Sequence, residues 1–121
     1  MKTIMVVDDD ITVRQLTKAV LEKSGYRVLL AGTGREALAL AGSELPDLAV
    51  IDINLPDLSG TQVANSLSQN PLTQRIPIIF LTGMLSLDEE KQLHNTLGGN
   101  FFLAKPCDRE KLLKAVVKKI G

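Results

Sequence analysis

Ionisable and hydroxyl-bearing residues stand at the ends of several apolar runs of this chain. Asp8 and Asp9 follow the first run, and Asp52 ends a later one. Thr82 ends another run, and Lys105 directly follows the last one. Carboxylates that lie close together repel one another unless a cation neutralises them, so this set predicts a site that binds opposite charge.

The residue types of this set favour the chemistry of a metal and a phosphate. Carboxylate oxygens suit Mg²⁺, which keeps coordination positions for water and phosphate oxygens. A carboxylate beside such a cation can act as a nucleophile toward phosphorus and form an aspartyl phosphate. Each oxygen of the new phosphoryl group needs a partner, and Mg²⁺, the Lys105 ammonium and the Thr82 hydroxyl with nearby backbone N–H groups can provide them.

Five apolar, mostly β-branched runs would position these residues as strands, at 3–7, 26–31, 48–52, 76–82 and 101–104. The segments between them have the helical period, with apolar stripes at Val13, Leu16, Val20 and Leu21, at Val63, Ala64 and Leu67, and at Leu112, Leu113, Val116, Val117 and Ile120. Strands that alternate with helices predict an α/β fold with a parallel sheet covered on both faces. Ligands bind such a sheet at the carboxyl ends of its strands, where the candidate residues stand.

Helix starts are also marked in the sequence. Asp10 is expected to be the N-cap of the first helix. The pairs Thr33–Glu36 and Ser86–Glu89 have the spacing of capping boxes. Asp57 lies in a Pro- and Gly-containing stretch and is interpreted as a turn residue rather than a ligand.

Length and composition narrow the class of protein. The chain has 121 residues, 45% of them hydrophobic, and is expected to form one domain over 1–121. Lys+Arg and Asp+Glu both number 14, and aromatic residues are 3%, so no nucleic-acid partner and no membrane surface are expected. The single cysteine fits a reducing compartment, and the short first apolar run does not read as a signal peptide, so a cytoplasmic location is expected.

Four motifs follow one another along the chain in a familiar order: VVDDD, VIDINLPDLSG, PIIFLTG and FFLAKP. With these motifs the chain resembles the receiver domain of two-component response regulators, the family that includes the single-domain chemotaxis regulator. The resemblance implies a flavodoxin-like, doubly wound, five-stranded parallel sheet in the order 2-1-3-4-5. It also implies a phosphoacceptor that catalyses its own phosphorylation and dephosphorylation with Mg²⁺ as cofactor, rather than an enzyme acting on other substrates.

The resemblance also implies roles for particular residues. It makes Asp52 the phosphorylated residue, with Thr82 and Lys105 completing the catalytic site. It assigns four metal ligands, namely the carboxylates of Asp8, Asp9 and Asp52 and the backbone carbonyl of Asn54.

A switch is implied as well. Thr82 and Phe102 would pass the phosphorylation state to a face made of residues 87–97, 100–104 and 108–119. The Lys105–Pro106 peptide bond would be cis, a form that only X–Pro bonds adopt cheaply.

The implied partners are a histidine kinase or a phosphotransfer protein as donor, and a downstream effector or a fused output domain as receiver of the signal. The chain is therefore expected to be either a single-domain regulator or a piece of a longer protein.

Three other functions compete with this one. A pseudo-receiver that binds partners without phosphorylation would have lost an Asp, Thr or Lys of the site, and none is lost. A phosphatase of the haloacid-dehalogenase type needs a second Asp two residues after its nucleophile, where Asn54 stands. A nucleotide- or flavin-binding module would need glycines after the first strand, where the chain has DDDITVR.

Overall fold

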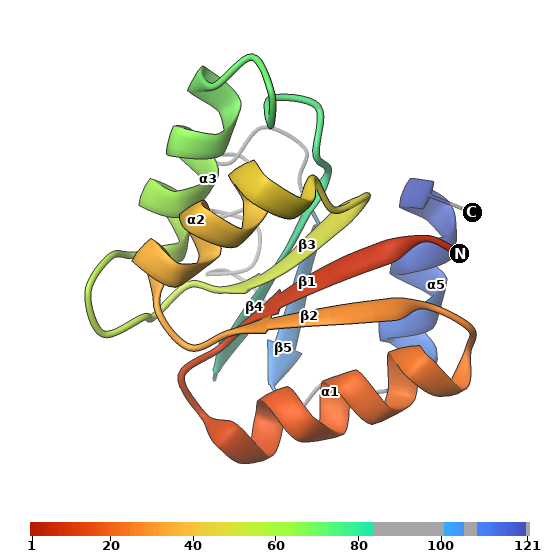
Figure 1. The fold of residues 1–121 in the computed structure, drawn as a ribbon. Coiled ribbons are helices and arrows are strands. Elements are labelled where there is room, and N and C mark those ends of the chain that lie inside the picture. Colours follow the sequence, from red (N-terminus) through yellow and green to blue (C-terminus); the bar gives the residue numbers. More distant parts are fainter. Residues whose placement is uncertain (84–100, 106–108, 121) are drawn as a thin grey trace.

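Five strands pair side by side into one parallel sheet in the order β2-β1-β3-β4-β5 (Figure 1). The computed structural model describes residues 1–83, 101–105 and 109–120. The strands are β1 (Thr3–Val7), β2 (Arg27–Ala31), β3 (Leu48–Asp52), β4 (Ile78–Gly83) and β5 (Phe101–Lys105). The helices are α1 (Ile11–Lys23), α2 (Gly34–Glu44), α3 (Gly60–Gln69) and α5 (Arg109–Ile120). The predicted fold class and strand order are confirmed.

Helices cover both faces of the sheet, with α2 and α3 on one face and α1 and α5 on the other (Figure 1). Successive strand residues point to opposite faces, so each strand contributes to two cores. In β1, Met5 and Val7 pack toward α2 and α3, whereas Ile4 and Val6 pack toward α1 and α5. All four are fully buried, which explains why the strands read as continuous apolar runs.

Two residues of the predicted helical stripes are exposed instead of buried. Leu16 is 64% exposed, and its neighbour Thr17 takes the buried position on α1 and donates its hydroxyl to the Val13 carbonyl at 2.7 Å. Val117 is 56% exposed, whereas Val116 is buried. Each apolar residue lies about 100° around its helix from the buried neighbour, which turns it away from the sheet.

The helix caps agree with the sequence in part. The Asp10 side chain accepts from the N–H groups of the first turn of α1, which confirms it as the N-cap. The Thr33 hydroxyl accepts from Glu36 N–H at 3.1 Å, but the Glu36 carboxylate accepts from Gly32 N–H rather than from Thr33. The predicted capping box is therefore only half formed. The Ser86–Glu89 pair, like the helix expected between β4 and β5, lies outside the described residues.

In the part of the chain that the structure describes, no helix has the length and apolar character needed to cross a bilayer. The helices instead bury one stripe each against the sheet, as the alternating pattern predicts.

Candidate functional site

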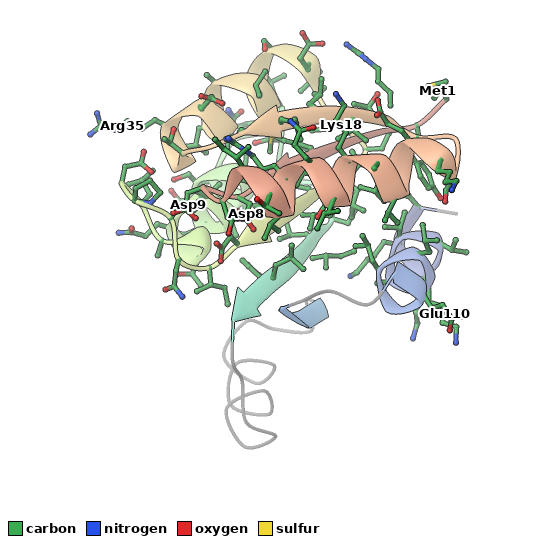
Figure 2. The ribbon with its side chains drawn as sticks, turned by 90° about the horizontal axis from the view of Figure 1, so that it is seen from below. Met1, Asp8, Asp9, Lys18, Arg35 and Glu110 are labelled. Carbon is green, nitrogen blue, oxygen red and sulfur yellow. The ribbon has the colours of Figure 1, made fainter. Side chains whose placement is uncertain are left out.

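Three carboxylates meet at the carboxyl end of the sheet. Asp8 and Asp9 follow β1, and Asp52 ends β3. Because β1 and β3 are paired neighbours with Val7 opposite Ile51, the next residue of each strand carries its side chain to the same place. One oxygen of each carboxylate lies within 4.8 Å of the others. Figure 2 shows Asp8 and Asp9 next to each other ahead of the first turn of α1.

The three acids differ in burial and in how they are held. Asp8 is fully buried; its N–H donates to the Ala31 carbonyl at 3.0 Å, and its Oδ1 accepts from Asp10 N–H at 2.9 Å. Asp52 is 4% exposed, and its Oδ1 accepts from Asn54 N–H at 3.1 Å. Asp9 is exposed. The cluster thus has two carboxylates at its floor and one at its rim, where solvent and ligands can reach it.

The loop from β3 to α3 is closed tightly at its base. Gly60 N–H donates to the Ile53 carbonyl at 2.7 Å, and Asn54 and Ser59 form an antiparallel bridge. Gly60 is needed there, because a Cβ at this position would lie 2.8 Å from Ile53 Cα and closer still to the Asp52 carbonyl oxygen. This packing fixes Asn54 directly beside Asp52.

A full capping box starts α3 and supports this loop. Ser59 and Gln62 exchange hydrogen bonds, from Gln62 N–H to the Ser59 hydroxyl at 3.1 Å and from Ser59 N–H to the Gln62 side chain at 2.9 Å. The Ser-x-x-Gln spacing is visible in the sequence but was not among the predicted boxes.

Strand pairing brings the other predicted residues to the same edge. Asp52 lies opposite Leu81 in the register of β3 and β4, so Thr82 is the next residue along. Lys105 lies opposite Gly83 at the end of β5. The structure does not describe where the side chains of Thr82, Phe102 and Lys105 point, and Pro106 lies outside the described residues. Of the predicted face, residues 87–97, 100 and 108 also lie outside them, whereas 101–104 and 109–119 belong to β5 and α5. The switch and the roles of these residues stay predictions.

Asp57 makes contacts that the sequence did not predict. Its Oδ1 accepts from Gly34 N–H at 2.8 Å and from Leu58 N–H at 2.9 Å, and its Oδ2 accepts from Arg35 N–H at 3.0 Å. The hydrogen bond from Gly34 N–H is the largest cause that holds the pKa of Asp57 below its ordinary value of 3.8, and bonds from other backbone N–H groups add to it. The turn interpretation missed this because nothing local marks a partner more than twenty residues away.

The donor set of the cluster fits a hard divalent cation. Its three ligand atoms are all carboxylate oxygens, with no sulfur or imidazole nitrogen among them. Mg²⁺ prefers such oxygens, and a cation would offset the repulsion among the three acids.

The sequence matches the profile of the response regulator receiver domain over residues 4–117. The chain belongs to this family. Protein PilH of Pseudomonas aeruginosa is 37% identical over 116 residues, which cover 96% of this chain and 95% of PilH. The family prediction made from the four motifs is confirmed.

A longer relative and a solved structure agree with this membership. The alkaline phosphatase synthesis transcriptional regulatory protein PhoP of Bacillus subtilis is 39% identical over 98% of this receiver domain, which spans 49% of PhoP. The crystal structure of the Vibrio cholerae chemotaxis protein CheY4 superposes with a TM-score of 0.88 at 32% identity, covering 99% of both chains. This chain therefore matches relatives of similar length and a relative about twice as long.

Proposed function

We propose that this receiver domain accepts a phosphoryl group on Asp52 from a phosphohistidine of a histidine kinase or a phosphotransfer protein. The observation that carries the proposal is the cluster of Asp8, Asp9 and Asp52, whose oxygens lie within 4.8 Å of one another at the carboxyl end of the sheet. Membership of the receiver family supports it.

Four groups of the chain would hold Mg²⁺, namely the carboxylates of Asp8, Asp9 and Asp52 and the backbone carbonyl of Asn54. When bound, the ion neutralises the carboxylates and the charge of the phosphoryl oxygens. The base of the β3–α3 loop supports this assignment, because it keeps Asn54 beside Asp52.

The reaction is a displacement at phosphorus. A carboxylate oxygen of Asp52 forms the new P–O bond while the P–N bond to the donor imidazole breaks, and its electron pair stays on the imidazole nitrogen. Lys105 and Thr82 would donate to the phosphoryl oxygens, so the domain contributes by positioning and charge neutralisation. Attack by water on the phosphorus later breaks the P–O bond to Asp52, which releases inorganic phosphate and returns Asp52 to a carboxylate. The domain thus catalyses its own phosphorylation and dephosphorylation.

Phosphorylation would act at a distance through Thr82 and Phe102. When Thr82 moves toward the phosphoryl group, Phe102 can turn inward and hide its ring, which is worth roughly 1.5–3 kcal/mol and shifts a two-state equilibrium by about tenfold or more. The partner that recognises this change is a downstream effector or a fused output domain.

We take residues 1–121 as one receiver domain. We place it in the cytoplasm, because its one cysteine fits a reducing compartment.

The test uses acetyl phosphate with Mg²⁺ and intact-mass spectrometry. The wild-type domain should gain one phosphoryl group, and Asp52→Asn should gain none. Asp47→Asn is the matched control. Asp47 is an exposed carboxylate just before β3, at the amino end of the strands, where it accepts from Thr3 N–H. Labelling of Asp52→Asn to the wild-type level would contradict the proposal.

A further inference from the structure

One side chain ties two segments that meet beside the carboxylate cluster. Asp57 belongs to the β3–α3 loop, and its two oxygens accept from the first two N–H groups of α2, those of Gly34 and Arg35, at 2.8 and 3.0 Å. The Thr33 hydroxyl accepts from the third N–H group of the helix, that of Glu36. The start of α2 is therefore satisfied by its own N-cap together with a residue of another loop.

The two segments are also in direct contact. A Cβ at Gly34 would lie 2.8 Å from Leu58 Cβ, so only glycine allows the start of α2 to come this close to the loop. Figure 2 shows Arg35 at the same end of the molecule as Asp8 and Asp9. The contact and the hydrogen bonds of Asp57 together join α2 to the loop that follows Asp52.

The loop is thus held at two places, at its base, where Asn54 lies, and at its far side. At its base, Ile53 bonds to Gly60, and Asn54 bridges Ser59. At its far side, Asp57 bonds to α2. Without the Asp57 carboxylate, only the base and the packing of Leu58 against Gly34 would hold the loop, and the orientation of the Asn54 peptide group would be less restricted.

We propose that Asp57 is a positioning residue for the metal site, which it serves by fixing the loop that presents the Asn54 carbonyl. The inference rests on the proposed function, because it takes that carbonyl as a ligand. Residues that orient the ligands of a metal typically change its affinity by about tenfold or more when they are replaced. We therefore expect Asp57→Ala to bind Mg²⁺ about tenfold more weakly.

The Asp57 hydrogen bonds should couple the β3–α3 loop and the start of α2 in both directions. If the loop and α2 move as one unit, then binding of Mg²⁺ is coupled to the state of the α2 amides, and the coupling is reciprocal. The amide resonances of Gly34 and Arg35 should shift as Mg²⁺ saturates the wild-type domain. In Asp57→Ala the resonances of these two amides should no longer shift as Mg²⁺ is added.

A loss of negative charge alone could also weaken cation binding, and the design separates this effect. Asp47→Ala also removes one negative charge and one hydrogen bond to a backbone N–H, that of Thr3 at 2.7 Å. Asp47 lies at the amino end of the strands, away from the carboxylate cluster. A through-space effect fades at high salt, whereas a change in loop position persists. Asp57→Asn keeps one acceptor oxygen for the α2 amides and should lose less affinity than Asp57→Ala.

The experiment titrates Mg²⁺ into each ¹⁵N-labelled variant at low and at high salt and follows the amide spectra. We expect wild-type affinity for Asp47→Ala, an intermediate loss for Asp57→Asn and the full loss for Asp57→Ala at both salt concentrations. Should Asp57→Ala fail to fold, the comparison of Asp57→Asn with Asp47→Asn decides. Equal Mg²⁺ affinities of wild type and the Asp57 variants, or a loss that vanishes at high salt, would overturn the role of Asp57 alone. A wild-type domain that binds no Mg²⁺ would overturn the proposed function together with it.

Discussion

Replacing Gly60 by alanine should destabilise the domain although the residue opens a helix. The added Cβ would lie 2.8 Å from Ile53 Cα and closer to the Asp52 carbonyl oxygen, whereas ordinary contacts begin at 3.4 Å. The obstacles are backbone atoms, so either the end of β3 or the start of α3 must move by about 0.6 Å or more.

The expected magnitude follows from two opposing effects. Overpacking of this kind costs about 1–3 kcal/mol. Replacing glycine by alanine also restricts the unfolded chain, which returns about 0.4–1 kcal/mol. Taken at the middle of the two ranges, the net loss in free energy of unfolding is about 1.3 kcal/mol, with an upper limit of about 2.6 kcal/mol, or a drop of roughly 4–10 °C in Tm for a domain of this size.

Two further glycines provide matched controls for this prediction. Gly42 lies within α2 with nothing within 4 Å of an added Cβ, so Gly42→Ala should raise Tm by roughly 2–5 °C. Gly34→Ala would meet Leu58 Cβ at 2.8 Å and Val63 Cγ2 at 2.9 Å, which are side-chain rather than backbone atoms, so its effect should fall between the other two. Thermal melts by circular dichroism measure all three variants. A Gly60→Ala domain at least as stable as the wild type would refute the steric reasoning.

The remaining predictions concern charge, pH and the switch. Asp9→Ala should lower Mg²⁺ affinity by about tenfold or more, which calorimetric titration measures. With chelator present, the variant should have a free energy of unfolding about 1 kcal/mol higher in urea denaturation, because the repulsion among the acids is smaller. Unchanged Mg²⁺ affinity would contradict the assignment of Asp9 as a ligand. Because folding lowers the pKa of Asp57 below 3.8, its stabilisation is present above that pH and lost below it. The Tm gap between wild type and Asp57→Asn should therefore be constant near neutral pH and close in acid, and a gap that widens in acid would be incompatible with this sign. Beryllofluoride should shift amide resonances over 87–97, 100–104 and 108–119 in the wild type and far less in Thr82→Ala; shifts confined to the loops around Asp52 would argue against the switch.

Much of the fold was predictable from local patterns. The strands over 3–7 and 48–52 were predicted with their observed bounds, because fully buried parallel strands leave continuous apolar runs. The N-cap at Asp10 was predictable for a similar reason, since a cap acts on N–H groups two and three residues away.

Helix faces were less predictable than the helices themselves. Leu16 is hydrophobic yet exposed, and Thr17 is polar yet buried with its hydroxyl bonded to the Val13 carbonyl. Composition cannot distinguish these neighbours, because the sheet decides which side of α1 it covers and a threonine can satisfy its hydroxyl within its own helix.

The sequence by itself determined the residue types of the site and their places at strand ends, and its four motifs were enough to predict the receiver family. Tertiary structure decided which of these residues meet. The acids of β1 and β3 are more than forty residues apart, and their oxygens come within 4.8 Å because the two strands are neighbours in register. Asp57 accepts from the N–H groups of Gly34 and Arg35, which precede it by 23 and 22 residues. Such long-range contacts depend on strand order and on the close packing of α2 against a loop, which no local stretch of sequence encodes.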